Sequence, residues 1–468
     1  MGIFGSMSRY QRTELNTIND ILYHRAQGQT AKRAFIFLQD DGSERGVLTY
    51  AELHHRAQAI AADIAKYASP GERILMLYPP GLEFVEAFFG CLYAGAIAVP
   101  AYPPRKNQKL GRLEAIIKDC HPALVMTTQN QALRDQPTFE ENMGYSLPWL
   151  CNEQVTSDLR PLPTLEVASP DDIAFLQYTS GSTGDPKGVM VSHGNLMHNE
   201  EMIRLATEHT EETVFVSWLP MFHDMGLIGN LVQTVYMGCQ CVLMSPASFL
   251  QKPVRWLEAI TKYRGTTSCA PNFAFNLCAE QVTEEEKAHL DLSSWTVAVN
   301  AAEPIRAETL EVFSEAFAQC GFSRQVFYPC FGLAEGTLIV SGCQKSRQPV
   351  VLHVDAESLT KDKVLSVDAE SQNALALVSS GHEWYDQEIV IVNPETNERC
   401  AADEVGEIWT RGSSVAQGYW NKPEETKQTF GAYLVTGEGP YLRTGDLGFL
   451  NHSELYVTGR HKDFGNLR

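Results

Sequence analysis

Apolar and polar positions in the first hundred residues follow two alternating periods, and each change of period marks a new element. Thr49 and Glu52 have the spacing of a helix capping box, and apolar residues recur after them on one helical face. A helix is therefore predicted to follow Thr49. The apolar run 73–78 predicts a buried strand, the period of 84–95 predicts a helix, and 97–99 predicts the next strand.

The same strand, helix, strand rhythm continues through most of the chain. Further strands are predicted at 123–127, 213–218, 241–244 and 296–299, and a helix is predicted through Leu310, Phe313 and Phe317. Such alternation predicts parallel sheets covered by helices, and hence an α/β fold. After about residue 385 the pattern changes to short strands with close turns at 388–392, 407–410 and 455–458. A small β-rich subdomain is expected there.

Length sets the expected domain organisation. A chain of 468 residues exceeds what one hydrophobic core usually supports. We expect two α/β subdomains over about 7–385 and the β-rich subdomain over about 386–459. Residues 1–6, before Met7, are interpreted as a cloning remnant. Segment 342–372 is polar and only weakly periodic, and its simplest interpretation is a solvated excursion.

Composition and charge exclude several classes of partner. The formal net charge is -20, spread along the chain without a long basic run, so neither nucleic acid nor an anionic membrane is expected as a partner. The longest uncharged stretch, 87–102, is too short for a membrane span. Eleven cysteines without a CxxC pair indicate reduced thiols in a cytoplasmic protein rather than a zinc site.

The richest chemistry lies in one loop, Tyr178-Thr-Ser-Gly-Ser-Thr-Gly-Asp-Pro-Lys-Gly188. Apolar 173–176 leads into it and apolar 189–191 leads out, which predicts strand, loop, strand. A Walker loop would need glycine before Lys187, where this chain has Pro186, and would need a helix afterwards. Hydroxyls, glycines and a lysine together still suit a polyphosphate, because freed backbone N–H groups can turn toward an anion. A flexible Ser/Gly hairpin loop is the alternative for this loop in isolation.

Three further motifs follow the loop in a fixed order. They are Phe331-Gly-Leu-Ala-Glu335, Tyr441-Leu-Arg-Thr-Gly-Asp446 and Gly459-Arg-His-Lys-Asp463. Together with the loop they resemble the AMP-forming adenylating superfamily of acyl-CoA synthetases, nonribosomal peptide adenylation domains and luciferases. The resemblance covers about 15–468. It implies an ATP-dependent enzyme that forms an adenylate with the help of Mg²⁺.

The resemblance implies a nucleotide site built from these motifs. It assigns Glu335 to Mg²⁺, Asp446 to the ribose hydroxyls and Arg460 to the ribose and phosphate region, roles that suit carboxylate and guanidinium groups. The residues expected to bind the phosphates are Thr179, Ser180, Gly181, Ser182, Thr183, Gly184 and Lys187. Those expected around the adenine are Asn300, Ala301, Ala302, Glu303, Phe331, Gly332, Leu333 and Ala334. Phe331 stands where the family usually has tyrosine, which would keep the aromatic face and lose a hydroxyl.

The acyl end and the hinge are implied in the same way. Phe222-His-Asp-Met-Gly-Leu227 resembles the motif beside the reacting carboxylate, so His223 and Met225 are expected at the acyl pocket, with a cap or core histidine as the alternative for His223. Asn272 and Phe273 are expected there too. Lys187, Glu335 and His223 are the expected catalytic residues, and Lys462 occupies the usual hinge position.

Three features resemble the fatty acyl-AMP ligase subfamily in particular. They are the segments 99–104 and 270–275 and the Phe-Gly-Leu-Ala-Glu form of the motif at 331–335, while 342–372 lies where that subfamily carries an insertion. The resemblance implies that a medium- or long-chain fatty acid becomes an acyl-adenylate. Its acceptor would be an acyl carrier protein of a polyketide, nonribosomal peptide or lipid pathway, because the insertion is thought to hinder thiolation by CoA.

Rival interpretations remain open on the sequence. A fatty acyl-CoA ligase of the same fold would carry 342–372 as a mere loop, and a nonenzymatic nucleotide- or lipid-binding module could retain the fold. An amino-acid adenylating enzyme would usually place an aspartate in the pocket, for which Asp224 is the nearest candidate. We also expect the superfamily's small C-terminal domain to be largely absent, with 460–468 as the hinge and its start. Such a chain would adenylate poorly.

Overall fold

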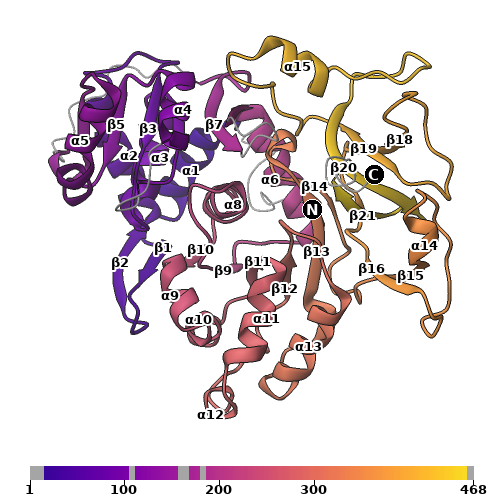
Figure 1. The fold of residues 1–468 in the computed structure, drawn as a ribbon. Coiled ribbons are helices and arrows are strands. Elements are labelled where there is room, and N and C mark those ends of the chain that lie inside the picture. The colour runs from indigo at the N-terminus through magenta and orange to yellow at the C-terminus, as the bar shows by residue number, and fades with distance from the viewer. Residues whose placement is uncertain (1–14, 105–110, 156–167, 180–185, 461–468) are drawn as a thin grey trace.

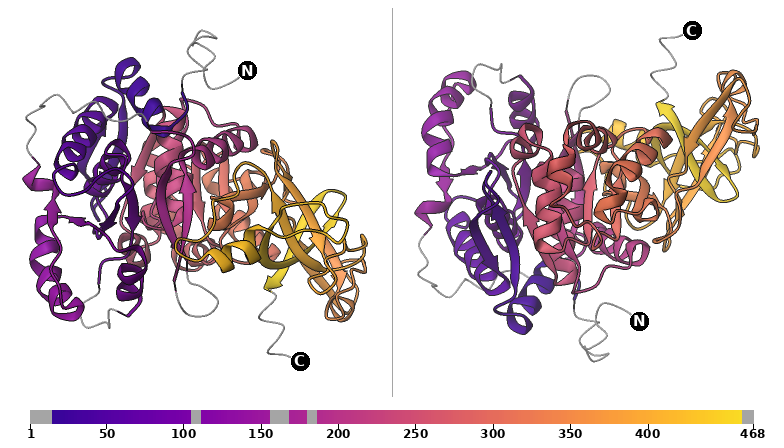
Figure 2. Two further views of the ribbon diagram at one scale, coloured as in Figure 1. Left: turned by 90° about the horizontal axis from the view of Figure 1, so that it is seen from above. Right: turned by 90° about the horizontal axis from the view of Figure 1, so that it is seen from below.

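The structure is a computed structural model that describes residues 15–104, 111–155, 168–179 and 186–460. Its α/β part contains two large sheets, and a smaller antiparallel sheet follows toward the C-terminal end (Figure 1). Seen from above and below, the sheets follow one another in that order (Figure 2). The predicted fold class, mainly parallel α/β sheets with a β-rich subdomain, is confirmed.

The first large sheet has six strands in the order β6-β5-β3-β4-β7-β8. All neighbours are parallel except β7 and β8. The strands are β3 (Arg73–Met76), β4 (Ile97–Pro100), β5 (Leu124–Thr127), β6 (Trp149–Cys151), β7 (Ile173–Thr179) and β8 (Lys187–Ser192). The accompanying helices are α2 (Tyr50–Ile64), α3 (Leu82–Tyr93), α4 (Gly111–Cys120), α5 (Gln129–Met143) and the short η2 (Asn152–Gln154). Helix α2 begins after Thr49 with the predicted capping box to Glu52.

The second large sheet has nine strands in the order β17-β14-β13-β12-β11-β9-β10-β1-β2. Strand β1 pairs with β10, and β2 pairs with β1 at the edge, so the start of the chain completes a sheet formed mostly by residues about two hundred positions later. The strands are β1 (Arg33–Leu38), β2 (Glu44–Thr49), β9 (Val214–Ser217), β10 (Gln240–Leu243), β11 (Thr267–Ala270), β12 (Val297–Asn300), β13 (Phe327–Gly332), β14 (Ile339–Gly342) and β17 (His382–Glu383).

Helices cover both faces of the nine-stranded sheet. One face packs on an aromatic core that includes Trp256, Phe275 and Phe313. The helices of that face and of the loops beside it are α9 (Pro246–Gln251), α10 (Val254–Tyr263), α11 (Asn272–Gln281), α12 (Glu284–Lys287), α13 (Ala307–Phe317), η4 (Ala318–Cys320) and η5 (Arg324–Val326). The opposite side carries α1 (Ile18–Gly28), α6 (His193–Thr207), α7 (Asp224–Gly226), the π-helical η3 (Leu227–Val232) and α8 (Gln233–Met237), and η6 (Ala334–Gly336) follows β13.

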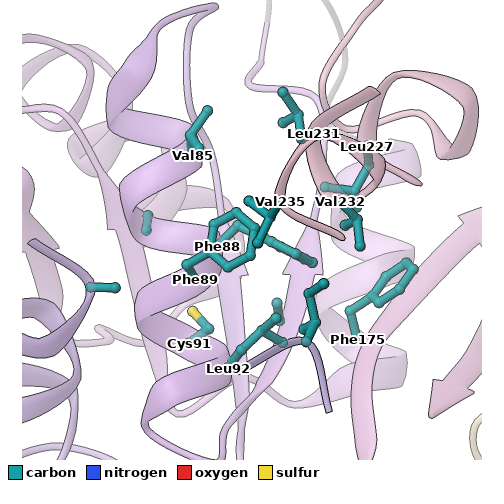
Figure 3. Close-up of a cluster of buried hydrophobic side chains, with 14 of the residues drawn as sticks. Val85, Phe88, Phe89, Cys91, Leu92, Phe175, Leu227, Leu231, Val232 and Val235 are labelled. Atoms are coloured by element: carbon teal, nitrogen blue, oxygen red, sulfur yellow. The ribbon is translucent and has the colours of Figure 1, made fainter. Parts of the chain in front are cut away.

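The two large sheets are joined by one apolar cluster. Val85, Phe88 and Phe89 of α3 belong to one apolar cluster with side chains of η3 and α8, and the Phe175 ring of β7 packs edge-on against Phe88 (Figure 3). Gly90 lets α2 approach α3 closely, because a Cβ there would lie 2.3 Å from the Ile60 side chain. Helix α3 is therefore packed from both sides.

The antiparallel part is a four-stranded sheet in the order β18-β19-β20-β21, with a separate pair β15-β16 beside it. The elements are β15 (Val351–Asp355), α14 (Ala356–Leu359), β16 (Ala374–Val378), β18 (Glu388–Val392), β19 (Gly406–Arg411), α15 (Pro423–Phe430), β20 (Leu442–Asn451) and β21 (Glu454–Arg460). Val354 of β15 is buried against Phe449 and Tyr456 of the four-stranded sheet. Most residues of 356–372 are exposed, as the solvated-excursion interpretation of 342–372 expects, whereas strand β15 with its buried Val354 departs from that interpretation.

Two other sequence expectations concern burial and membranes. Nine of the eleven cysteines are buried and all are free thiols, as the reduced-thiol interpretation expects. Burial raises the pKa of Cys330 to about 12 and that of Cys400 to about 11, so these thiols stay protonated. Within the described ranges, every helix is too short or too polar to cross a bilayer.

The apolar cluster around α3 predicts a large loss of stability on truncation. Phe88 is fully buried, so Phe88→Ala should lower the free energy of unfolding by about 3–5 kcal/mol through lost burial and a residual cavity. Urea denaturation followed by circular dichroism measures the change. The control Leu133→Ala alters a side chain that is 73% exposed and should change stability by less than about 0.5 kcal/mol. Equal effects of the two variants would contradict this view of the core.

Candidate active site

A cavity of about 990 Å³ lies where the three larger sheets meet. The six-stranded sheet contributes Thr179 and Lys187, the nine-stranded sheet contributes Ala301 and Phe331, and the four-stranded sheet contributes Asp446. In parallel α/β sheets, ligands bind beyond the carboxyl ends of the strands. The cavity has that position, because Ala301 directly follows β12 and Phe331 lies near the end of β13.

The predicted strand, loop, strand around the phosphate loop is present. Strands β7 and β8 pair antiparallel, with Thr179 opposite Lys187, so both ends of the loop open on the cavity. The predicted phosphate ligands Ser180, Gly181, Ser182, Thr183 and Gly184 lie outside the described residues, as does the hinge residue Lys462. Of this predicted set, the structure therefore places Thr179 and Lys187.

Lys187 is held at the cavity by two contacts from the C-terminal part of the chain. Its ammonium group forms an ion pair with Glu425 of α15 and lies 4.8 Å from the centre of the Tyr419 ring. The Tyr419 hydroxyl donates a hydrogen bond of 2.7 Å to Glu335 Oε1. Burial, reinforced by Glu335, raises the pKa of Tyr419, so this hydroxyl remains a donor. Tyr419 thus links the predicted phosphate lysine to the predicted metal carboxylate.

Asp446 and Arg460 lie opposite each other on β20 and β21. The Arg460 Nε is 3.2 Å from Asp446 Oδ1. Burial, opposed by Arg460 and reinforced by Glu335, raises the pKa of Asp446 to about 6. Beside this pair, buried Glu407 accepts from Arg443 and from the backbone N–H of Gly445 at 3.1 Å, and so fixes the turn before Asp446.

Of the predicted adenine segment 300–303, two residues line the cavity and two support the segment from outside it. Ala301 and Ala302 line the cavity, and Ala302 has a left-handed φ of 71°, which is uncommon for a residue with a Cβ. Asn300 is buried below them and donates to Asn272 Oδ1 at 3.4 Å. Glu303 Oε1 accepts from the backbone N–H of Phe273 at 2.7 Å. Asn300 and Glu303 therefore hold the segment in place and are not among the cavity-lining residues.

The second predicted adenine motif lies entirely at the cavity. Phe331, Gly332, Leu333 and Ala334 all line it. Gly332 has no room for a side chain, because a Cβ there would lie 2.0 Å from the Leu338 carbonyl oxygen. Close approach of two backbone segments therefore requires glycine at this position.

The predicted acyl residues divide in the same way. His223 and Met225 line the cavity. His223 Nδ1 is 2.7 Å from Asp224 Oδ1, and this hydrogen bond raises the pKa of the imidazole. Asn272 is instead buried at the first position of α11, where it donates to Thr309 Oγ1, and Phe273 is 44% exposed beside Trp218. The structure does not bring Asn272 and Phe273 to the cavity.

A mainly apolar extension of the cavity lies between the nine-stranded sheet and the helices α6 and η3. The side chains and backbone that line it are Ile203, Thr207, His209, Phe215, Gly229, Thr267, Cys269, Val299, Tyr328, Cys330, Leu338 and Ile339. Sequence analysis missed all of these residues, along with Tyr419 and Glu407. No sequence signal separates them, because buried strand residues and channel-lining residues have the same composition.

The donor set at the cavity fits a magnesium ion that is held mainly by substrate. Mg²⁺ in nucleotide sites commonly uses one or two protein carboxylates, with phosphates and water completing its shell. Glu335 offers such a carboxylate, whose Oε1 is oriented by Tyr419. Among the described residues there is no group of three or more acidic, histidine or cysteine side chains that could hold a metal alone.

The geometry defines a class of protein: a nucleotide-sized polar cavity that continues into an apolar channel. A family model described as AMP-binding enzyme matches residues 22–420, and the chain belongs to that family. An adenine nucleotide is thus its expected ligand.

Individual proteins similar to this chain are fatty-acid ligases. The chain is 43% identical over 460 residues to the medium-chain-fatty-acid--[acyl-carrier-protein] ligase JamA of Moorena producens, covering 97% of this chain and 78% of that protein. It is 35% identical to the corresponding ligase TtuA of Teredinibacter turnerae, covering 95% and 76%. A crystal structure of fatty acyl-adenylate ligase from L. pneumophila, with acyl adenylate and pyrophosphate, matches with a TM-score of 0.91 at 43% identity, covering 97% of this chain and 78% of that one. The resemblance to fatty acyl-AMP ligases is confirmed.

The raised pKa of Asp446 predicts a pH dependence for nucleoside binding. A carboxylate accepts from ribose hydroxyls better than a carboxylic acid does, so the affinity for adenosine should be constant above about pH 7 and fall by up to about tenfold per unit below pH 6. Because the folded pKa is raised, ionisation lowers the stability of the free protein as pH rises toward 6. Calorimetric titration with adenosine measures the dependence. The Asp446→Asn variant should bind adenosine more weakly, and its affinity should not depend on pH in this range. If the variant keeps the pH profile of the parent, Asp446 is not the titrating group.

The ion pair of Lys187 predicts competition between Glu425 and phosphate. Glu425→Gln should tighten pyrophosphate binding about two- to fivefold, because the Glu425 side chain is 40% exposed and ion pairs screened by solvent are worth about 0.2–1 kcal/mol. Glu424→Gln removes the same charge from the neighbouring exposed residue of α15 and serves as the matched control. Calorimetry with pyrophosphate compares the two. Equal tightening in both variants would show a general charge effect and no specific competition.

Proposed function

We propose that this chain activates a fatty acid with ATP to an acyl-adenylate and pyrophosphate. The observation that supports this proposal most strongly is that a polar region and an apolar region are joined in one cavity. Its polar end contains Lys187, Glu335 and Asp446, and its apolar extension has no charged lining residue among those described. An acyl-adenylate has the same division between a charged nucleotide and an apolar chain.

The polar groups suit adenylation as a reaction of positioning and charge neutralisation. The fatty carboxylate attacks the α-phosphorus of ATP, a P–O bond to the carboxyl oxygen forms, and pyrophosphate leaves with the bonding electrons. Lys187 would neutralise the outgoing phosphates, and Asp446 would hold the ribose. His223, whose pKa is raised by Asp224, would place partial positive charge beside the reacting carboxylate.

Magnesium is proposed as the metal cofactor, held by Glu335 and the nucleotide phosphates. When bound, it would offset negative charge on those phosphates. Tyr419 orients Glu335 Oε1 for this purpose and packs against Lys187. One side chain would therefore position both Lys187 and the carboxylate that holds the metal ion.

An acyl carrier protein is proposed as the acyl acceptor, with CoA as the rival. Two relatives named as acyl-carrier-protein ligases support this choice. The packed insertion supports it as well, because β15 is anchored on the four-stranded sheet by Val354, Phe449 and Tyr456 and is no loose loop. An insertion packed on this sheet would restrict the rearrangement that thiolation by CoA needs.

An isotope experiment tests the proposed reaction. A fatty acid labelled with ¹⁸O in its carboxylate should yield AMP that carries one ¹⁸O atom after acyl transfer to a carrier protein, because the carboxylate oxygen becomes bonded to phosphorus. Mass spectrometry of the AMP reads the label. Unlabelled AMP, or acyl-CoA as the main product when both acceptors are offered, would contradict the proposal.

Lys187 should be essential to that activity. Lys187→Ala removes a cation aimed at the phosphates and should lower acyl-adenylate formation about 10²-fold, as loss of one preorganised donor typically does. Lys262→Ala serves as the control, since this lysine binds the Gly42 carbonyl far from the cavity. Acyl-adenylate trapped as its hydroxamate measures the rate. A Lys187→Ala enzyme within about threefold of the parent would refute the phosphate role.

A further inference from the structure

The apolar channel follows one face of the nine-stranded sheet. Thr267 and Cys269 are two residues apart on β11, so their side chains share a face. Residues paired across neighbouring strands lie on the same face of the sheet. Cys269 pairs with Val299, and Val299 pairs with Tyr328, so this face continues over β12 and β13. All four residues line the channel. The channel therefore runs along the strands from their carboxyl ends toward their amino ends.

The deep end of the channel is polar. His209, just after α6, is buried, and its Nε2 lies 3.1 Å from Thr267 Oγ1, at the amino end of β11. Phe215 of β9 pairs with Thr267 and packs edge-on against the His209 ring at 4.9 Å. Thr207 lines the same end and donates its hydroxyl to the Ile203 carbonyl oxygen at 2.6 Å.

A buried hydrogen-bond network fixes His209 in this place. The Gln233 amide is best oriented with its nitrogen donating to the Glu200 carboxyl, which turns its oxygen toward His209 Nδ1 at 3.5 Å. Burial raises the pKa of Glu200 and lowers the pKa of His209 to about 3, so both groups are neutral. A neutral imidazole with its proton on Nδ1 can donate to Gln233 and accept from Thr267. Each ring nitrogen then has a partner.

The register also gives the depth of the channel. Ala301 follows Asn300, which pairs with Ala270, so Thr267 lies four strand positions below the level of Ala301. At about 3.3 Å per residue, this separation is about 13 Å. An extended hydrocarbon, whose bonds of about 1.5 Å advance it by somewhat less than their length, fills that depth with about ten carbons.

We propose that His209 and Thr267 form the floor of the acyl channel and that His209 limits the substrate to medium-chain fatty acids. This inference rests on the proposed function, since it concerns the same channel. A longer chain would have to displace His209, which would leave Thr267 and Gln233 without their buried partners. His209 is thus a specificity-determining residue, and it does not touch the reacting atoms.

Binding of non-hydrolysable acyl-adenylate mimics tests the floor. In these probes a sulfamate replaces the phosphate, and the acyl chain is varied from about six to about sixteen carbons. Each methylene that enters the channel should tighten binding about fourfold, equivalent to about 0.8 kcal/mol, until the floor is reached. For the unsubstituted protein we expect binding to stop tightening when the acyl chain reaches about ten carbons.

Two variants should move that limit in opposite directions. His209→Ala opens the floor and should extend the gain by about two carbons, because truncation of a buried side chain leaves a cavity. Cys269→Leu adds volume halfway along the channel and should shorten the optimum by about two carbons through overpacking. The second variant keeps the hydrogen bonds of His209, so it remains informative if His209→Ala fails to fold.

A matched control separates the channel from general destabilisation. His193→Ala removes another buried imidazole, at the first position of α6, which does not line the channel. It should lower stability and leave the chain-length profile unchanged. Profiles that do not move in either channel variant would overturn the inference while leaving the proposed function intact. Failure of every acyl-adenylate mimic to bind the parent chain would instead refute the proposed function.

Discussion

The packing of helix α3 between two sheets is the constraint on which the site depends. Nine of its twelve residues are buried, and the helix contacts α2 as well as strands β3, β4 and β5 of one large sheet and β1 and β2 of the other. This contact fixes the six-stranded sheet against the nine-stranded sheet so that Lys187 and Ala301 reach one cavity. The four-stranded sheet closes that cavity with Asp446. Neither large sheet could form the site alone.

Within the cavity, polar and apolar regions are kept apart by the strands themselves. Charged groups gather beyond the carboxyl ends, where Tyr419 connects Lys187 with Glu335 and where burial raises the pKa of Asp446. The channel below is lined mainly by strand and helix side chains and ends at His209. One ligand with a charged head and an apolar tail satisfies both regions, whereas a nucleotide alone would leave the channel unused.

The sequence predicted local elements well because their signals are local. The capping box of Thr49 and Glu52 and the apolar strands on either side of the phosphate loop were enough to place α2, β7 and β8. The pairing of β1 with β10 has no local signal. For 342–372, the polar composition correctly indicated exposure of most residues but gave no sign of strand β15 or of the contact of Val354 with Phe449.

Site residues could be predicted where they belong to a sequence motif. Residues that reach the site only through the folding of the chain could not be predicted. The motifs led to Lys187, Glu335 and Asp446, all at the cavity, but also to Asn272 and Phe273, which support or flank it. Tyr419 and His209 come from segments without a recognised motif, and Glu407 lies in a predicted strand that gave no sign of a role at the site. Their positions depend on contacts with residues distant in the sequence, such as His209 with Thr267 and Tyr419 with Glu335, which periodicity does not encode.

The most direct test of the account is a crystal structure of this chain with a medium-chain acyl-adenylate mimic. We predict that the ribose binds at Asp446 and that the acyl tail lies along Cys269 and Val299, ending beside His209. A tail that leaves the cavity toward solvent, with the channel still closed by side chains, would contradict the central claim that one cavity serves both ends of the ligand.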